Sequence, residues 1–268
     1  MIISDCHNHT GISSDSDTPM SDMIRSAIKK NIQIMCITEH MDFDFPKNYE
    51  YNFVFEPCEY FRQLEANSQK FAGDIKLLKG VELGLKENIA CKCNALLNDY
   101  KWDFVIGSIH LVDDMDPYYD EYWKLYGLDG AIKRYFETMY NNINEYHDFD
   151  ALGHLDYVLR YAPGITKDID ISHSYELIDE ILKFIIKKDI ALEVNTSGYK
   201  TFLHNPNPSP AIIKRYRELG GKLITIGSDA HSPEYIGFHF EDVKKLLNSL
   251  GIYEYAIFEN RKPDLREL

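Results

Sequence analysis

The segment Lys222-Leu223-Ile224-Thr225-Ile226-Gly227-Ser228-Asp229-Ala230-His231 joins an apolar run to a carboxylate and an imidazole. The run 223–227 has the length of a buried β-strand, so Asp229 and His231 would stand directly beyond the strand end. Similar arrangements occur in Cys6-His7-Asn8-His9-Thr10, Thr38-Glu39-His40, Ser108-Ile109-His110 and Gly153-His154-Leu155-Asp156. One such histidine carries little information, but five sites in one chain indicate strand ends that converge on metal ions.

Short apolar runs alternate with amphipathic segments along the chain. The strand-like runs are 2–6, 34–38, 75–82, 104–108, 151–153, 190–195 and 223–227, and helix-like segments cover about 19–30, 57–72, 86–100, 129–146, 174–188 and 209–219. Thr18-Pro19 and Ser209-Pro210 predict helix starts with hydroxyl caps. The segment 111–128 is too irregular for a plain helix, and we expect it to lie over the mouth of the fold.

Seven strand–helix repeats without a linker predict one α/β domain over residues 1–268, built on a parallel sheet. Because every candidate ligand follows a strand, we favour a closed or nearly closed barrel, in which reactive groups project from the C-terminal strand ends. A doubly wound open sheet is the alternative. It would not bring all the strand ends around one centre.

Composition narrows the class of protein. A content of 29 Lys+Arg against 43 Asp+Glu leaves a formal charge of −14, which argues against nucleic-acid binding through phosphate neutralisation. No apolar run approaches the roughly 20 residues that span a bilayer, and no signal peptide is visible before Ser4-Asp5. The five cysteines are an odd number, which fits reduced thiols. We therefore expect a soluble cytoplasmic protein without a membrane or nucleic-acid partner.

The spacing of the polar residues predicts how they bind metal. His7 and His9 are one residue apart, so in an extended strand both rings point to the same face and can hold one cation. Asp229 and His231 repeat this spacing. Glu82 closes the apolar run 75–82, where an isolated carboxylate would be costly, and a position between two cations would remove that cost.

The donors are nitrogens and carboxylates without a thiolate, which suits zinc, iron or manganese. With His40, His110 and His154, the set exceeds the four ligands of one zinc ion and would serve two or three divalent ions if one ligand is shared. Multinuclear sites of this kind hydrolyse phosphate esters.

Taken in order, these motifs resemble those of the polymerase-and-histidinol-phosphatase (PHP) superfamily. The resemblance runs over about 3–231 and continues in Ser232-Pro233-Glu234-Tyr235-Ile236-Gly237 and Phe258-Glu259-Asn260-Arg261-Lys262-Pro263. With Leu192-Glu193-Val194-Asn195-Thr196-Ser197-Gly198, these pieces resemble the histidinol-phosphatase branch. The resemblance implies a distorted (β/α)7 TIM-like barrel with a trinuclear metal centre at the C-terminal strand ends.

The resemblance also implies a ligand set for each ion. The first ion would be held by His7, His9, Glu82 and Asp229, the second by Glu82, His110 and His154, and the third by Asp15, His40 and His231. Many relatives have a histidine at the position of Asp15. Asp17 is the alternative ligand, and we favour Asp15.

The implied reaction is hydrolysis of L-histidinol phosphate in histidine biosynthesis. A water or hydroxide bridging two ions would attack phosphorus, since bound metals lower the pKa of water to about 7. Asp229 or His231 would relay a proton to the leaving alcohol. Arg160 would bind phosphate oxygens through its guanidinium fork, and Lys200 is a second candidate for substrate binding.

Several alternatives stay open. The chain could hydrolyse another small phosphomonoester or nucleic acid, although the charge of −14 disfavours the latter, or it could be a scaffold domain, which the full ligand set disfavours. The tyrosine-rich segment 118–126 either covers the substrate ring or packs a loop onto the rim. Asp5 and Asp156 either orient imidazoles or are ordinary loop carboxylates. The resident metal and the oligomeric state are not predicted.

Overall fold

The computed structural model describes residues 2–164 and 169–268. At its centre lies a sheet of seven parallel strands, each hydrogen-bonded to the next in chain order. They are β1 (Ser4–Asp5), β2 (Ile34–Met41), β3 (Lys76–Gly84), β4 (Phe104–Ser108), β5 (Ala151–Leu152), β6 (Ala191–Asn195) and β7 (Ile224–Gly227). Each coincides with one of the predicted apolar runs, or overlaps it. Every residue of β4, β6 and β7 is buried, as expected for parallel strands covered on both faces.

The sheet curls until its first and last strands meet. The Cys6 N–H donates to the Ile226 carbonyl at 3.1 Å and the Asp229 N–H donates to the His7 carbonyl at 2.9 Å. A parallel bridge joins Asn8 to Ala230 at the same seam. These bonds confirm the predicted TIM-like barrel and exclude the open doubly wound sheet, whose outermost strands would not pair with each other.

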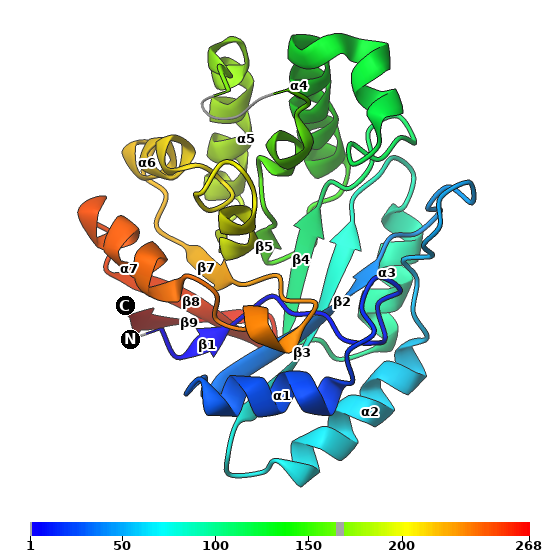
Figure 1. Ribbon diagram of the computed structural model, residues 1–268, viewed down its shortest axis with the longest axis vertical. Coiled ribbons are helices and arrows are strands. Elements are labelled where there is room, and N and C mark those ends of the chain that lie inside the picture. The colour runs from blue at the N-terminus through cyan, green and yellow to red at the C-terminus, as the bar shows by residue number, and fades with distance from the viewer. Residues whose placement is uncertain (1, 165–168) are drawn as a thin grey trace.

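Helices surround the barrel (Figure 1). They are α1 (Met20–Lys29), α2 (Pro57–Lys70), α3 (Ala90–Asp99), α4 (Asp120–Glu145), α5 (Tyr175–Lys187), α6 (Pro210–Glu218) and α7 (Phe240–Ser249). The prediction of irregular structure through residue 128 was wrong from Asp120 onward. Gly127, at φ 64° and ψ 171°, breaks α4 near its start, and this break interrupts the helical periodicity of the sequence.

Ser209 is the N-cap residue of α6 and Pro210 its first residue, as predicted, whereas the N-cap residue of α1 is Pro19 and not Thr18. Neither α1 nor α6 has a side-chain cap hydrogen bond. The Thr18 hydroxyl donates instead to the His231 carbonyl at 3.2 Å, and the Ser209 N–H donates to Asp156 at 2.8 Å. These residues therefore connect the helix starts to the loops at the barrel mouth.

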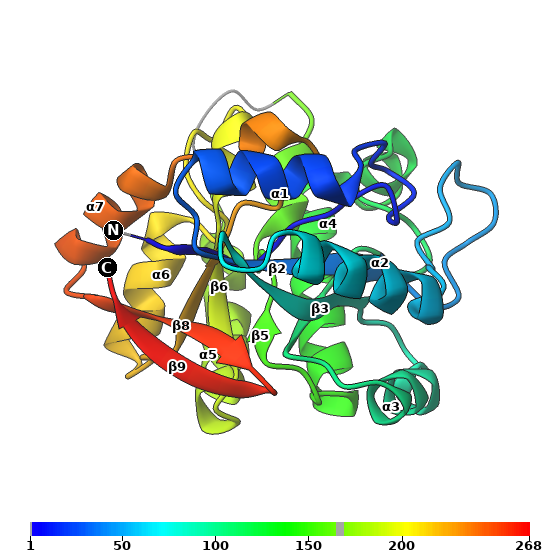
Figure 2. The same cartoon turned by 90° about the horizontal axis from the view of Figure 1, so that it is seen from below.

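The C-terminal part adds a hairpin that sequence periodicity did not predict. β8 (Glu254–Glu259) and β9 (Lys262–Glu267) pair antiparallel, and the turn residues Asn260 and Arg261 donate to Asp103 and Asp150. Both aspartates stand just before strands, so the hairpin covers the N-terminal end of the barrel (Figure 2). None of the helices in the described ranges combines the length and the apolar character that crossing a membrane requires. The single domain over 1–268 stays a prediction.

Candidate metal centre

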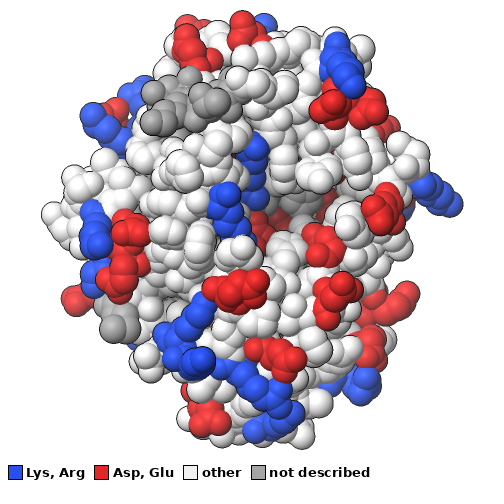
Figure 3. All heavy atoms as spheres, viewed as in Figure 1, with Lys and Arg blue, Asp and Glu red and all other residues white. Residues whose placement is uncertain are grey.

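The predicted ligands all come from the C-terminal strand ends or the loops that follow them. His7 and His9 follow β1, His40 and Glu82 lie near the ends of β2 and β3, His110 and His154 follow β4 and β5, Asp229 and His231 follow β7, and Asp15 lies between β1 and α1. On the face seen in Figure 3, acidic side chains are visible inside a central hollow, with basic side chains beside it.

Four side chains converge as the ligands of a single ion would. His7 Nε2 lies 3.1 Å from His9 Nε2, 3.1 Å from Glu82 Oε2 and 3.8 Å from Asp229 Oδ1. His9 Nε2 lies 3.4 Å from Glu82 Oε2 and 3.5 Å from Asp229 Oδ1. A tetrahedral zinc site with bonds of about 2.1 Å separates its ligand atoms by about 3.4 Å. The four donors therefore fit a cation without rearrangement.

The Glu82 carboxylate faces two groups of donors. Its Oε2 points to His7 and His9, whereas its Oε1 lies 3.2 Å from His110 Nε2 and 2.9 Å from His154 Nε2. Oε2 is buried and accepts no hydrogen bond from any described residue. A buried oxygen without a hydrogen-bond partner is unusual in proteins, and a bound metal ion would supply the missing interaction. This geometry fits a carboxylate that bridges two ions.

A third group lies on the outer side of His9. Asp15 Oδ2 is 3.0 Å from His231 Nε2 and 3.5 Å from His40 Nε2. The His9 ring packs between those of His40 and His231, with ring centroids 4.2 and 4.3 Å away. Asp15 Oδ1 has no hydrogen-bond partner in the described part of the chain. Asp17 is exposed, so the structure places Asp15 rather than Asp17 beside these imidazoles.

Burial and neighbouring charges shift the pKa values of these candidate ligands. Burial alone would raise the pKa of Glu82, but His7, His110 and His40 together hold it well below its ordinary value. Burial and then the neighbouring His40 lower the pKa of His9 to about 3, so this imidazole is neutral. Burial opposes protonation of His110, but Asp42 and Glu82 outweigh it and raise its pKa to about 10. Metal binding would release the proton from such a histidine.

Carboxylates that the sequence analysis did not single out orient the imidazoles. His7 Nδ1–H donates to Glu193 at 2.6 Å, and His110 Nδ1–H donates to Asp42 at 2.7 Å. Such bonds set the ring orientation and leave the other nitrogen for metal. Asp42, His40 and His110 also form a compact group of donors. Because Asp42 already accepts the His110 proton, we assign it to positioning. A carboxylate inside a buried strand was the signal for Glu193, as it was for Glu82.

In the described part of the chain, Asp5 and Asp156 form no hydrogen bond or ion pair with an imidazole ring, so they do not orient the metal-binding histidines. Asp5 accepts the Ser228 N–H at 2.9 Å and the Gly237 N–H at 2.9 Å. Asp156 accepts the Asn207 side-chain amide at 2.5 Å and the Ser209 N–H. Both carboxylates hold loops at the barrel mouth in place.

Glycine is required at one strand end next to the ligands. A Cβ on Gly227 would overlap the Cβ of His7 and would lie 3.0 Å from Glu193 Oε1. The backbone of β7 therefore packs directly against His7, and a side chain at position 227 would displace this metal-binding candidate.

Arg160, the predicted phosphate-binding residue, lies beside the cluster. Its guanidinium donates to Asn207 Oδ1 at 2.7 Å, to Asn195 Oδ1 at 3.2 Å and to Asp229 Oδ2 at 3.4 Å. It also lines the pocket into which His110 and His154 open. Lys200 is placed differently. Its ammonium lies 3.8 Å from the centroid of the Tyr235 ring, and it is not among the side chains that line the pocket.

The tyrosine-rich segment packs against the fold. Tyr122 and Trp123 are buried in the core, and Tyr118 is 62% exposed. The aromatic residues that line the pocket come from elsewhere in the chain: Phe45, Phe53, Tyr157 and Tyr161. The structure thus favours packing over substrate cover for 118–126, although Asp116 of the preceding loop does reach the pocket.

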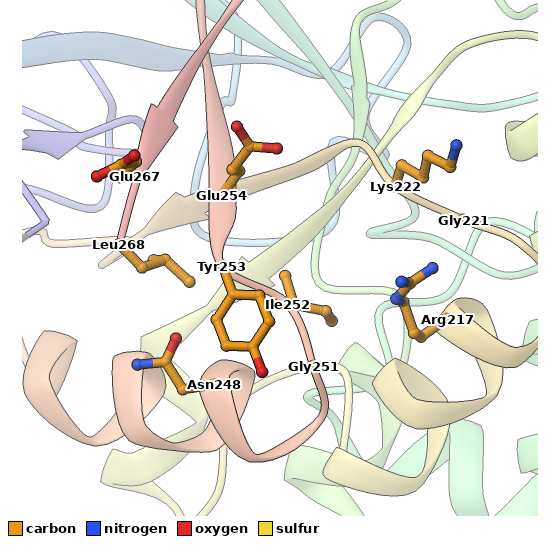
Figure 4. Close-up of a pocket in the computed structure, with 10 residues that line it drawn as sticks. All are labelled: Arg217, Gly221, Lys222, Asn248, Gly251, Ile252, Tyr253, Glu254, Glu267 and Leu268. Atoms are coloured by element: carbon orange, nitrogen blue, oxygen red, sulfur yellow. The ribbon is translucent and has the colours of Figure 1, made fainter.

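A second pocket lies at the other end of the barrel (Figure 4). Arg217 and Lys222 stand on one side of it, and Glu254 and Glu267 stand on the other. Lys222 precedes β7, whereas the metal-binding candidates follow the strands. None of the predicted site residues lines this pocket.

A parallel barrel whose mouth gathers histidine and carboxylate donors around a pocket defines a class: the metal-binding hydrolases of TIM-like fold. The family model for the PHP domain matches residues 5–197. The chain therefore belongs to the PHP family, and its relatives place it in the histidinol-phosphatase branch.

These relatives match nearly the whole length of the chain. The chain is 35% identical to a probable histidinol-phosphatase of Clostridium acetobutylicum, over 97% of this chain and 98% of the relative. It is 30% identical to the histidinol-phosphatase of Lactococcus lactis, over 97% and 96%. The crystal structure of histidinol phosphate phosphatase from L. lactis, complexed with zinc, L-histidinol and phosphate, superposes with a TM-score of 0.87 at 28% identity, covering 98% of this chain and 99% of that one.

Proposed function

We propose that this protein hydrolyses L-histidinol phosphate to L-histidinol and phosphate. The observation that carries the proposal is the likeness, over nearly the whole chain, to a structure that holds zinc, L-histidinol and phosphate. A donor cluster beside an arginine-lined pocket supports the same reaction, because a phosphoryl group needs positive charge around its oxygens. Histidine biosynthesis and a cytoplasmic location follow from this activity as predictions.

We propose that two to three divalent ions of zinc, iron or manganese occupy the cluster. The donor atoms present suit these metals, and the spacing in the first group fits a tetrahedral ion. When bound, such ions supply Lewis acidity toward the phosphoryl oxygens and lower the pKa of a water molecule. Metal analysis of the purified protein, before and after chelation, tests their number and identity.

Arg160 is the proposed phosphate-binding residue. Three acceptors, Asn207, Asn195 and Asp229, hold the guanidinium at the pocket wall. A preorganised guanidinium loses little freedom when it binds two phosphoryl oxygens. Lys200 keeps a secondary role in this proposal, because its ammonium lies on the Tyr235 ring.

Asp229 is a better proton carrier than His231 in this geometry. Asp229 Oδ1 faces His7 and His9, whereas Oδ2 accepts from Ser197 at 3.1 Å and from Arg160 on the pocket side. Burial would raise the pKa of Asp229, but His7 and the hydrogen bond with His9 hold it well below its ordinary value. This low pKa keeps the carboxylate charged, as a metal ligand must be, so the proposal that Asp229 relays the proton rests on the position of Oδ2 on the pocket side. His231 Nε2 already faces Asp15.

The test is phosphate release by metal-loaded protein from L-histidinol phosphate, beside other phosphomonoesters and single-stranded DNA. We expect a kcat/KM for L-histidinol phosphate at least about a hundredfold above every competitor, in the enzyme-typical range of about 10⁴–10⁸ M⁻¹s⁻¹. Slow hydrolysis of many esters would contradict the named substrate. Complete inactivity with metal bound would favour the scaffold alternative.

A further inference from the structure

Glu39 is a buried carboxylate that the proposed metal centre does not use. It precedes His40 in β2, and because successive side chains of a strand point to opposite faces, it points away from the side on which the His40 imidazole lies. Glu39 is fully buried. Since a buried carboxylate is costly without hydrogen bonds, the groups that satisfy Glu39 indicate what this charge does in the fold.

Two residues of the loop between β1 and α1 satisfy this carboxylate. Thr10 donates its N–H to Glu39 Oε2 at 3.1 Å and its hydroxyl to Oε1 at 2.5 Å. Ser13 donates its N–H to Oε2 at 3.1 Å and its hydroxyl to the same oxygen at 2.5 Å. The Ser13 carbonyl then accepts the Ser16 N–H at 3.1 Å, which closes the turn that carries Asp15. Glu39 therefore anchors the loop from which Asp15 reaches the donor cluster.

Ser13 connects Glu39 to a candidate metal ligand. Its Oγ lies 3.3 Å from His9 Nδ1 and accepts the His40 N–H at 3.1 Å. His9 Nε2 faces the other donors of the first group. When Nε2 binds an ion, the ring proton is on Nδ1 and is donated to Ser13 Oγ, whose own proton goes to Glu39. An imidazole, a hydroxyl and a carboxylate thus form one hydrogen-bonded chain.

The His9 ring occupies a position on which two groups of donors depend. Its Nε2 belongs to the first group, while the rings of His40 and His231 stack against it with centroids 4.2 and 4.3 Å away. A tilt of this ring would therefore displace the outer group of donors as well as the first. The contact that fixes its Nδ1 is for this reason important to the whole cluster.

We propose that Ser13 and Glu39 are positioning residues of the metal centre, with the Ser13 hydroxyl linking the charge of Glu39 to the His9 ring. This inference rests on the proposed function through its metal ions, and it does not depend on the identity of the ester. A partner behind a metal-binding imidazole fixes the ring and strengthens its other nitrogen as a ligand. His7 has such a partner in direct contact, Glu193, whereas His9 reaches its carboxylate through a hydroxyl.

The variant Ser13→Ala tests the proposal because it removes the linking hydroxyl and leaves the carboxylate in place. We expect zinc affinity to fall about 10- to 100-fold for at least one ion per chain, the usual cost of losing the partner behind a metal-binding histidine. Competition with a chromophoric chelator measures this affinity without reference to turnover.

The matched control is Thr10→Val, which removes a hydroxyl bound to the other oxygen of the same carboxylate at the same distance. Within the described ranges, this hydroxyl forms no hydrogen bond with an imidazole. Zinc affinity of Thr10→Val should therefore stay within about twofold of the wild type. Both variants lose a buried hydrogen bond to a carboxylate, so both chelated proteins should melt at a lower temperature than the chelated wild type. Only the change in zinc affinity separates positioning from a structural role.

The outcomes separate this inference from the proposed function. Equal zinc affinities of Ser13→Ala and Thr10→Val would overturn the role of Ser13. If Ser13→Ala does not fold, Glu39→Gln replaces it, because glutamine can keep its oxygen toward Ser13 and turn its amide to the Thr10 hydroxyl. Loss of the charge should then weaken zinc binding by about tenfold, and unchanged affinity would overturn the proposal. A wild-type protein that binds zinc without hydrolysing L-histidinol phosphate would refute the proposed function alone, and the comparison of the variants would still decide the role of Ser13.

Discussion

Replacing Glu193 by glutamine should weaken metal binding while the barrel stays folded. Glu193 Oε1 accepts the His7 Nδ1 proton at 2.6 Å, and Oε2 accepts the backbone N–H of His154 at 2.8 Å. Glutamine has nearly the same volume but only one acceptor oxygen. It can therefore satisfy only one of these two donors, and His7 loses either its orientation or the negative charge that makes its Nε2 a strong ligand.

The expected magnitude follows from the geometry of this bond. Both side chains are almost completely buried, so water cannot replace the lost acceptor. Removal of a partner behind a metal-binding histidine typically costs 10- to 100-fold in affinity or activity, which corresponds to about 1.4–2.7 kcal/mol. We expect zinc affinity and kcat each to fall within this range, with KM little changed.

Zinc affinity is measured by competition with a chromophoric chelator, and turnover is measured by phosphate release at saturating metal. The matched control is Glu241→Gln on the exposed face of α7, which should behave like the wild type. Circular dichroism confirms that both variants are folded. A Glu193→Gln protein with unchanged zinc affinity and unchanged kcat would show that other contacts orient His7, and the reasoning would be refuted.

Further substitutions test other parts of the site. Metal-loaded Glu82→Ala should lose more than about a hundredfold in turnover, since it removes the carboxylate that faces both donor groups, and near-normal turnover would refute the bridging role. Arg160→Ala should raise KM for the phosphate ester by about tenfold or more, and unchanged KM and kcat would leave Arg160 a structural role only. Gly227→Ala should lower the free energy of unfolding by about 1–3 kcal/mol because its Cβ overlaps His7, and thermal unfolding beside the helix control Gly130→Ala checks this. Chelated protein should unfold at a lower temperature than metal-loaded protein, because metal at about a thousandfold above its Kd adds about 4 kcal/mol, and equal melting temperatures would contradict tight binding.

Much of the fold could be predicted because its signals are local. The apolar runs locate all seven strands, and the spacing of His7 and His9 in an extended chain predicts that both rings share a face. Polar residues directly after buried strands identify the mouth, since parallel strands present their C-terminal ends together. In the hairpin, β8 contains the buried apolar run 255–258, which the sequence analysis did not assign to a strand. Its partner β9 gave no comparable signal, because β9 is exposed along its whole length.

The contacts across the barrel could not be predicted from the same signals. Glu193 meets His7 although 186 positions separate them, and the choice of Asp15 over Asp17 depends on where the loop turns. Strand position and residue spacing are properties of neighbouring residues, so the chain itself determined them. Which imidazole meets which carboxylate depends on barrel closure and strand register, and only the packed tertiary structure decides these, because they arise from contacts between segments far apart in the chain.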